Sequence, residues 1–144
     1  MPLESIPRKT VRSPYQYAIA GSIGLAVAMG VGRFAFTPVL PVMQDDAGLS
    51  IADGGWLAAA NYFGYFIGAV AALAVSGRAS TLIRASLLVT ALVTAGMGIA
   101  ASFPVWLALR GIAGFASAFV LVFVSAWALQ RVTPSGRPIL TGVV

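Results

Sequence analysis

Long apolar runs separated by short polar connections fill most of this chain. Four of them cover roughly residues 17–42, 55–75, 85–102 and 104–129, and an α-helix needs roughly 20 apolar residues to cross a bilayer. A cleavable signal peptide is the alternative for the first run, but its apolar residues continue through Met43, too far for such a peptide. The pattern therefore predicts an all-α membrane protein with four transmembrane helices.

The segments outside these runs are short and polar. Residues 1–16 are rich in proline and charge and are predicted to form a cytoplasmic tail ahead of a membrane domain over 17–144. The stretch "SFPVW" leaves only a very short loop between the third and fourth runs, so those helices should be antiparallel neighbours. The ending "GRPILTGVV" predicts that a fifth helix starts at about residue 138.

Composition agrees with a membrane protein and excludes several other classes. Of the 144 residues 59% are hydrophobic and 9% charged, whereas a soluble domain has about 25% charged residues. The net charge of +5 could indicate nucleic-acid binding, but an interface of that kind needs basic residues gathered on a solvated face. We therefore expect the lipid bilayer, and no nucleic acid, as the surrounding partner.

The basic residues outside the apolar runs all lie on one predicted side of the membrane. The connections after the first and third runs contain no Lys or Arg, and the positive-inside rule then places the N-terminus and the end of the fourth helix in the cytoplasm. Tyr and Trp residues are common at the two membrane–water interfaces. Those expected there are Tyr15, Tyr17, Trp56, Trp106 and Trp127. The basic residues are Arg8, Lys9, Arg12, Arg78, Arg84, Arg131 and Arg137.

The chain contains neither cysteine nor histidine. Disulfide and thiolate chemistry and a histidine proton relay are therefore excluded from this chain. No nucleophile–base set and no metal-ligand cluster can be recognised either, so we predict no enzymatic activity, no cofactor and no metal site.

Small residues recur four positions apart in three of the runs. Lipid provides no hydrophobic drive for helix association, so small residues that let backbones approach closely are expected at helix interfaces. The predicted packing motif consists of Gly64 and Gly68 in the second helix and Gly114 and Ala118 in the fourth, with a similar stripe at Gly24, Ala28 and Gly32 in the first.

Polar side chains inside the runs have two alternative interpretations. Asn61 and Tyr65 share one stripe of the second helix. Asn61 either bonds the backbone of a neighbouring helix or lines a polar cavity together with Tyr65, because an amide in hydrocarbon must find a partner. Thr90 and Thr94 are expected to bond carbonyls of their own helix.

Two arginines lie inside the predicted spans. Arg33 is nine residues before Val42, the expected outer end of its helix, which is a depth of roughly 13 Å at 1.5 Å per residue. Arg110 is roughly 9 Å inside the fourth helix. An arginine near the bilayer centre costs at least about 2.5–3.5 kcal/mol, and no Asp or Glu is expected within the four spans.

Each arginine could extend to the external headgroups, or both could face a water-filled cavity or an anionic partner. Pro38 and Pro41 favour the cavity, since they interrupt helix hydrogen bonding near the outer end of the first span, and irregular backbone is tolerated where it lines a cavity. The predicted cavity-lining residues are Arg33, Arg110, Asn61 and Tyr65.

The stretches "GLAVAMGVGRFAFTPVLPVMQDDAGLS" and "GGWLAAANYFGYFIGA" resemble the start of a major facilitator superfamily transporter, closest to its YbfB/YjiJ-type branch. In "RGIAGFASA", Arg110, Gly114 and Ala118 match the R-x-x-x-G-x-x-x-small motif of the fourth helix in that superfamily. The resemblance covers nearly the whole chain. It implies part of the N-terminal half of a helical bundle in the bacterial cell inner membrane, with the first and fourth helices beside a central cavity.

The connection "SGRASTLIRAS" departs from this resemblance. It keeps Gly77, Arg78 and Arg84 but lacks the aspartate of the cytoplasmic latch motif that the superfamily usually has. The fourth-helix arginine is associated there with proton-coupled exchange, but this chain offers no membrane carboxylate to exchange the proton.

The resemblance implies an N-terminal fragment of a secondary transporter that moves a small solute by alternating access, and the two arginines suggest that this solute carries an anionic group. Because transporters of this type rock two six-helix halves about a midplane site, the remaining helices would belong to another chain or to a longer parent protein. The alternatives are a self-contained four-helix exporter that acts as an oligomer, and a non-transporting or inactive truncated membrane protein.

Overall fold

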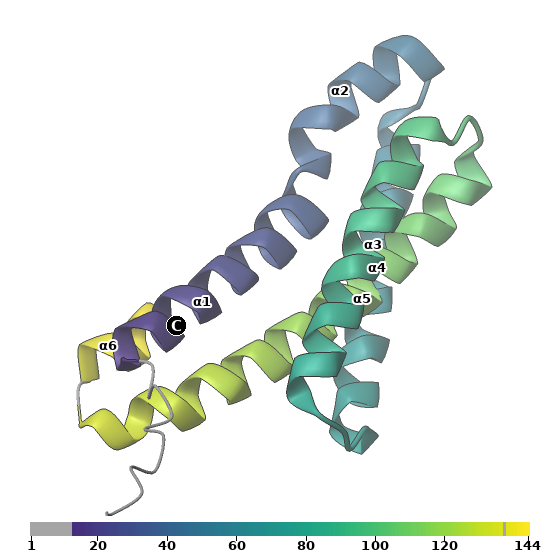
Figure 1. Ribbon diagram of the computed structural model, residues 1–144. Helices are drawn as coiled ribbons and strands as arrows, with labels where there is room; N and C mark the ends of the chain where they lie inside the picture. The colour runs from purple at the N-terminus through teal and green to yellow at the C-terminus, as the bar shows by residue number, and fades with distance from the viewer. Residues whose placement is uncertain (1–12, 137) are drawn as a thin grey trace, which may run out of the picture.

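The computed structural model describes residues 13–136 and 138–144, and the predicted tail over 1–16 lies almost entirely outside them. In the described part every regular element is a helix (Figure 1). Four helical stretches are long and apolar enough to cross a membrane, namely Pro14–Ala47, Ile51–Ala74, Ala79–Ile99 and Phe103–Ser135. The predicted all-α membrane fold is thereby confirmed.

The first stretch consists of three consecutive elements. It comprises α1 (Pro14–Ala26), the π-helix η1 (Val27–Phe34) and α2 (Phe36–Ala47). The stretch begins beside the capping residue Ser13, whose backbone N–H donates to Gln16 Oε1 at 3.2 Å. It ends at Gly48, which has a φ of 66°, a conformation in which glycine carries no steric penalty. The helix is thus several residues longer at each end than the apolar run at 17–42.

The next two helices alternate in direction, joined by short turns. A capping box starts α3 (Ile51–Ala74), in which Asp53 N–H donates to Ser50 Oγ at 3.1 Å and Ser50 N–H donates to the Asp53 carboxylate at 2.9 Å. The following helix, α4 (Ala79–Ile99), starts after the Arg78 connection. Both helices are close to the length of about 20 residues that spans a bilayer.

The central element is α5 (Phe103–Val132), which contacts α1, η1, α3 and α4. It continues into the short 3₁₀ helix η2 (Thr133–Ser135), and α6 (Pro138–Val143) follows where the sequence predicts the start of a fifth helix. Figure 1 shows α1, α6 and the C-terminal part of α5 gathered at one end of the molecule. There Ala18, Val132 and Leu140 form a buried cluster.

Close backbone contact joins α3 to α5. A Cβ atom added to Gly64 would fall within 3.0 Å of backbone atoms of Gly111, and one added to Gly114 would lie 2.9 Å from backbone atoms of Asn61 and Tyr65. One added to Gly68 would lie 2.6 Å from the carbonyl oxygen of Phe115 and 3.0 Å from Cβ of Ala118. The four residues of the predicted packing motif therefore lie at one helix crossing.

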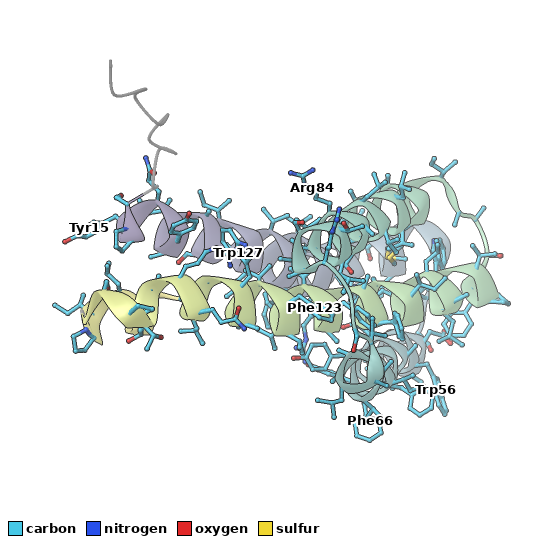
Figure 2. All side chains as sticks on the ribbon, turned by 60° about the horizontal axis from the view of Figure 1, so that its bottom comes forward. Tyr15, Trp56, Phe66, Arg84, Phe123 and Trp127 are labelled. Carbon is cyan, nitrogen blue, oxygen red and sulfur yellow. The ribbon has the colours of Figure 1, made fainter. Side chains whose placement is uncertain are left out.

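The outward face of α3 carries large apolar side chains. Trp56 and Phe66 point away from the bundle (Figure 2) and each is 65% exposed, as lipid-facing residues are. Trp106 is different, because it is buried and its indole N–H donates to the carbonyl of Met97 at 3.1 Å. Trp106 lies in the first turn of α5, and its side chain packs between α4 and α5 instead of facing outward.

Candidate functional site

The first span is irregular in the middle of the membrane domain. In η1 the backbone follows the wider π register, in which each N–H donates to the carbonyl five residues earlier. At its end the N–H of Ala35 donates to the carbonyl of Gly30 at 2.9 Å. Pro38 follows in the first turn of α2 and has no N–H to offer. The backbone is therefore irregular around Arg33, where the π register gives way to the first turn of α2.

Arg110 of α5 reaches this irregular backbone. Its Nη2 donates to the carbonyl oxygen of Arg33 at 3.4 Å, and its guanidinium carbon lies 4.3 Å from the centre of the Phe36 ring. The residue is only 5% exposed. Its Nε is buried and has no hydrogen-bond partner within residues 13–136 and 138–144, so the cation is held in place but its donors are not all satisfied.

Arg33 points to a different set of partners. Its guanidinium carbon lies 4.5 Å from the ring centre of Tyr65 and 4.9 Å from that of Tyr62, within the distance at which an aromatic face attracts a cation. Nη1 approaches Sδ of Met29 at 4.0 Å, and Nε is buried with no hydrogen-bond partner in the described part of the chain. The side chain is half-buried against α3.

Asn61 of α3 forms a hydrogen bond to the backbone of α5 at Arg110. It is 2% exposed, and its Nδ2 donates to the carbonyl oxygen of Arg110 at 3.1 Å. This is the contact that the packing interpretation of Asn61 requires. Thr90 donates to the carbonyl of Ser86 in its own helix at 2.9 Å, as expected.

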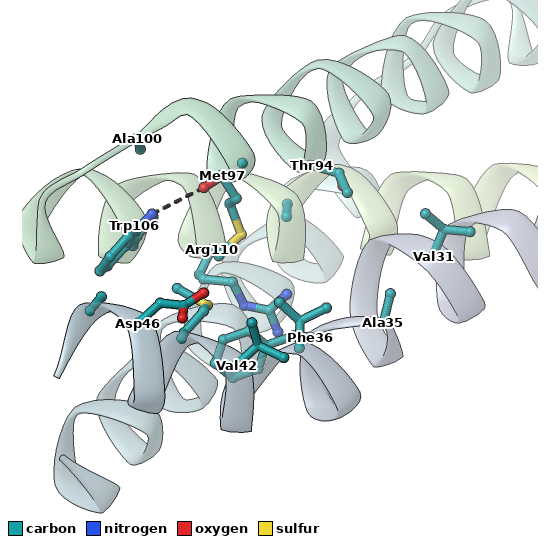
Figure 3. A pocket seen from close by; sticks show the side chains of 15 residues that line it. Val31, Ala35, Phe36, Val42, Asp46, Thr94, Met97, Ala100, Trp106 and Arg110 are labelled. Atoms are coloured by element: carbon teal, nitrogen blue, oxygen red, sulfur yellow. Dashed lines mark hydrogen bonds between the residues drawn. The ribbon is translucent and has the colours of Figure 1, made fainter. Parts of the chain in front are cut away.

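A pocket of about 470 Å³ lies among α2, α4 and α5, within the size range of small-molecule sites. Figure 3 shows Arg110 inside it, with Phe36 and Val42 on one side and Met97 and Thr94 on the other. Of the four predicted cavity residues only Arg110 lines this pocket. Arg33 meets Arg110 through its backbone, while Asn61 and Tyr65 lie on the α3 side.

Asp46 is a pocket residue that the sequence did not reveal. The expectation that no carboxylate lies within the helices is wrong at this point, because α2 continues to Ala47 and carries Asp46 in its last turn. The exposed Asp46 lines the pocket that holds Arg110 (Figure 3). Gly48, a helix-ending residue just beyond Asp46, was the available signal that the helix includes the two aspartates.

Comparison with known proteins gives one match. Residues 25–144 match the family described as "Uncharacterised MFS-type transporter YbfB". The matched range includes η1, the pocket and both arginines. No curated protein and no solved structure matches the chain at a significant level.

Proposed function

The chain belongs to the YbfB-type family of MFS transporters, and we propose that it supplies four helices of the N-terminal half of a secondary transporter for a small solute with an anionic group. In this proposal the anionic group binds at Arg110. The remaining helices come from a longer parent protein or from another chain, because alternating access requires two halves that rock about a shared site.

The observation that supports this proposal is the position of Arg110. A buried guanidinium is costly in a membrane unless an anion or a water-filled space compensates it. Here it lines a pocket and donates to a backbone carbonyl at 3.4 Å, and its Nε has no partner among the residues that the structure describes. An incoming carboxylate or other anion would satisfy these free donors with charge-assisted hydrogen bonds.

Arg33 has a supporting role in this proposal. Its side chain is held by Tyr62 and Tyr65 outside the pocket, and its positive charge adds to the potential that attracts an anion. Its backbone carbonyl fixes Arg110 at the break of the first span. Loss of its side chain should therefore affect transport less than loss of the Arg110 side chain.

We further propose that the protein is a multi-pass protein of the bacterial inner membrane with its N-terminus and the end of α5 in the cytoplasm. The distribution of basic residues supports this orientation. Arg78, Arg84 and Arg131 lie at the N-terminal side of α4 and in the last turn of α5, the ends that the sequence assigns to the cytoplasm.

Transport by proteoliposomes tests the proposed function. They would contain this chain together with the helices that complete it, and uptake of carboxylate-bearing solutes would be measured for wild type, Arg110→Gln and Arg84→Gln. Arg110→Gln should reduce uptake at least about tenfold, the loss expected for a charge-assisted hydrogen bond. The exposed Arg84 is the matched control for charge, and its variant should transport normally.

Undiminished uptake by Arg110→Gln would contradict the proposal. Uptake by vesicles that contain this chain alone would instead favour the self-contained exporter.

A further inference from the structure

The pocket that holds Arg110 carries a second charge of opposite sign. Arg110 lies deep, at 5% exposure, whereas Asp46 is exposed. Within the described part of the chain no ion pair of 4.0 Å or less joins Asp46 to an arginine. The two charges therefore face the same space without neutralising each other.

The wall around these charges is apolar. Phe36, Val39, Val42 and Met43 come from α2, and Met97 comes from α4. Such a wall favours a ligand with a hydrocarbon body, because ligand sites combine apolar walls with a few polar groups that fix orientation.

A simple anion or a simple cation would match only half of this pocket. An anion bound at Arg110 would leave the Asp46 carboxylate facing the same space with no cation. A cation bound at Asp46 would leave the buried Nε of Arg110 without a partner, and an uncompensated buried charge is strongly unfavourable. A ligand that carries both charges satisfies both residues.

We propose that the solute is a zwitterion with an apolar body, of the chemical class of an aliphatic or aromatic α-amino acid. Its carboxylate accepts hydrogen bonds from Arg110, its ammonium group donates to Asp46, and its hydrocarbon part packs against Phe36, Val42 and Met97. This inference rests on the proposed function, since it names the substrate class of the same pocket.

Three probes with closely similar carbon skeletons separate the contributions of the two charges. L-Leucine carries both charges, 4-methylpentanoate carries the carboxylate alone, and 3-methylbutylamine carries the ammonium group alone. Binding of each would be measured to the full 144-residue chain in lipid nanodiscs. Leucine should bind at least about tenfold more tightly than either single-charge probe, since each charge-assisted hydrogen bond contributes about 1.5–3 kcal/mol.

Two neighbouring variants provide the matched comparison. Asp46→Asn should bring leucine and 4-methylpentanoate to similar affinity, whereas Asp45→Asn should keep the preference for leucine, because Asp45 is exposed and does not line the pocket. Circular dichroism would confirm that both variants remain helical.

Each contrary result has a distinct meaning. Equal binding of leucine and 4-methylpentanoate to the wild type would overturn the zwitterion while leaving an anion site at Arg110. Binding of 3-methylbutylamine alone would overturn both the zwitterion and the proposed anion site. If no probe binds, or if Asp46→Asn keeps the preference, the zwitterion assignment is wrong, and the transport test of Arg110→Gln still decides the proposed function separately.

Discussion

Two intramembrane arginines meet at one point of the backbone and are stabilised differently. Arg33 places its guanidinium over the rings of Tyr62 and Tyr65, and a cation over an aromatic face gains about 0.5–2 kcal/mol. Arg110 places its own over Phe36 and donates to the Arg33 carbonyl. Neither arrangement neutralises the charge. An anion that enters the pocket beside Arg110 could therefore pair with this arginine.

Asn61 tests whether a polar residue in this region serves packing or solute binding. Its amide bonds the Arg110 carbonyl across the α3–α5 interface. Asn61→Leu, which removes the amide at similar volume, should lower the free energy of unfolding by about 1 kcal/mol, as interhelical hydrogen bonds in membranes contribute. Unfolding in mixed SDS micelles would measure this loss, and probe binding should persist.

Thr90→Val is the control for Asn61→Leu. The Thr90 hydroxyl donates to a carbonyl of its own helix and does not join two helices, so its removal should change stability less. A loss of probe binding in Asn61→Leu with unchanged stability would instead assign Asn61 to the cavity.

At the scale of the helices, the main feature of the first span is the π-helical segment between α1 and α2. The π register of η1 ends just before α2, and Arg110 of α5 donates to the carbonyl of Arg33 in this irregular segment. π-helical segments are rare and occur frequently at functional sites. The prolines in "TPVLP" indicated an interruption, but the irregular backbone lies before them, at Val27–Phe34.

The crossing of α3 and α5 depends on the absence of side chains. A methyl group at position 64 would contact the backbone of Gly111, which cannot move aside as a side chain can. Gly64→Ala should therefore destabilise the bundle by about 1–3 kcal/mol, the usual cost of overpacking. The same micelle unfolding measurement gives this value.

Gly55→Ala is the matched control on the same helix, because in the described structure no atom beyond its own stretch of helix lies within 4 Å of its added Cβ. It should leave stability unchanged or raise it by about 0.5–1 kcal/mol through helix propensity. Equal effects of Gly64→Ala and Gly55→Ala would show that the close approach does not hold the helices together.

For the whole molecule, the sequence predicted the spans well and the site only in part. Hydropathy identifies membrane helices because every backbone group in lipid must be satisfied within a helix. The packing glycines could also be predicted, since small-residue spacing has one common meaning in membranes.

The composition of the site could not be read from the sequence in the same way. Which residues line a pocket depends on how each helix is rotated, and a single sequence does not specify that rotation. Arg33 and Tyr65 were therefore grouped with Arg110 although they lie outside its pocket. Asp46 was placed outside the predicted helices, but it belongs to α2 and lines the pocket.

The central claim is that Arg110 faces a pocket that water can enter and attracts an anionic group into it. Because the chain has no cysteine, a single thiol can be placed there by Thr94→Cys and compared with Phe66→Cys on the exposed outer face of α3. The measurement is the rate of labelling by an anionic, membrane-impermeant methanethiosulfonate in nanodiscs. The thiol at position 94 should react at least about tenfold faster than the one at position 66, because position 66 faces lipid. Adding Arg110→Gln should slow the reaction at position 94, since the charge of Arg110 attracts the anionic reagent. Equal and slow labelling at both positions, unaffected by Arg110→Gln, would contradict the account.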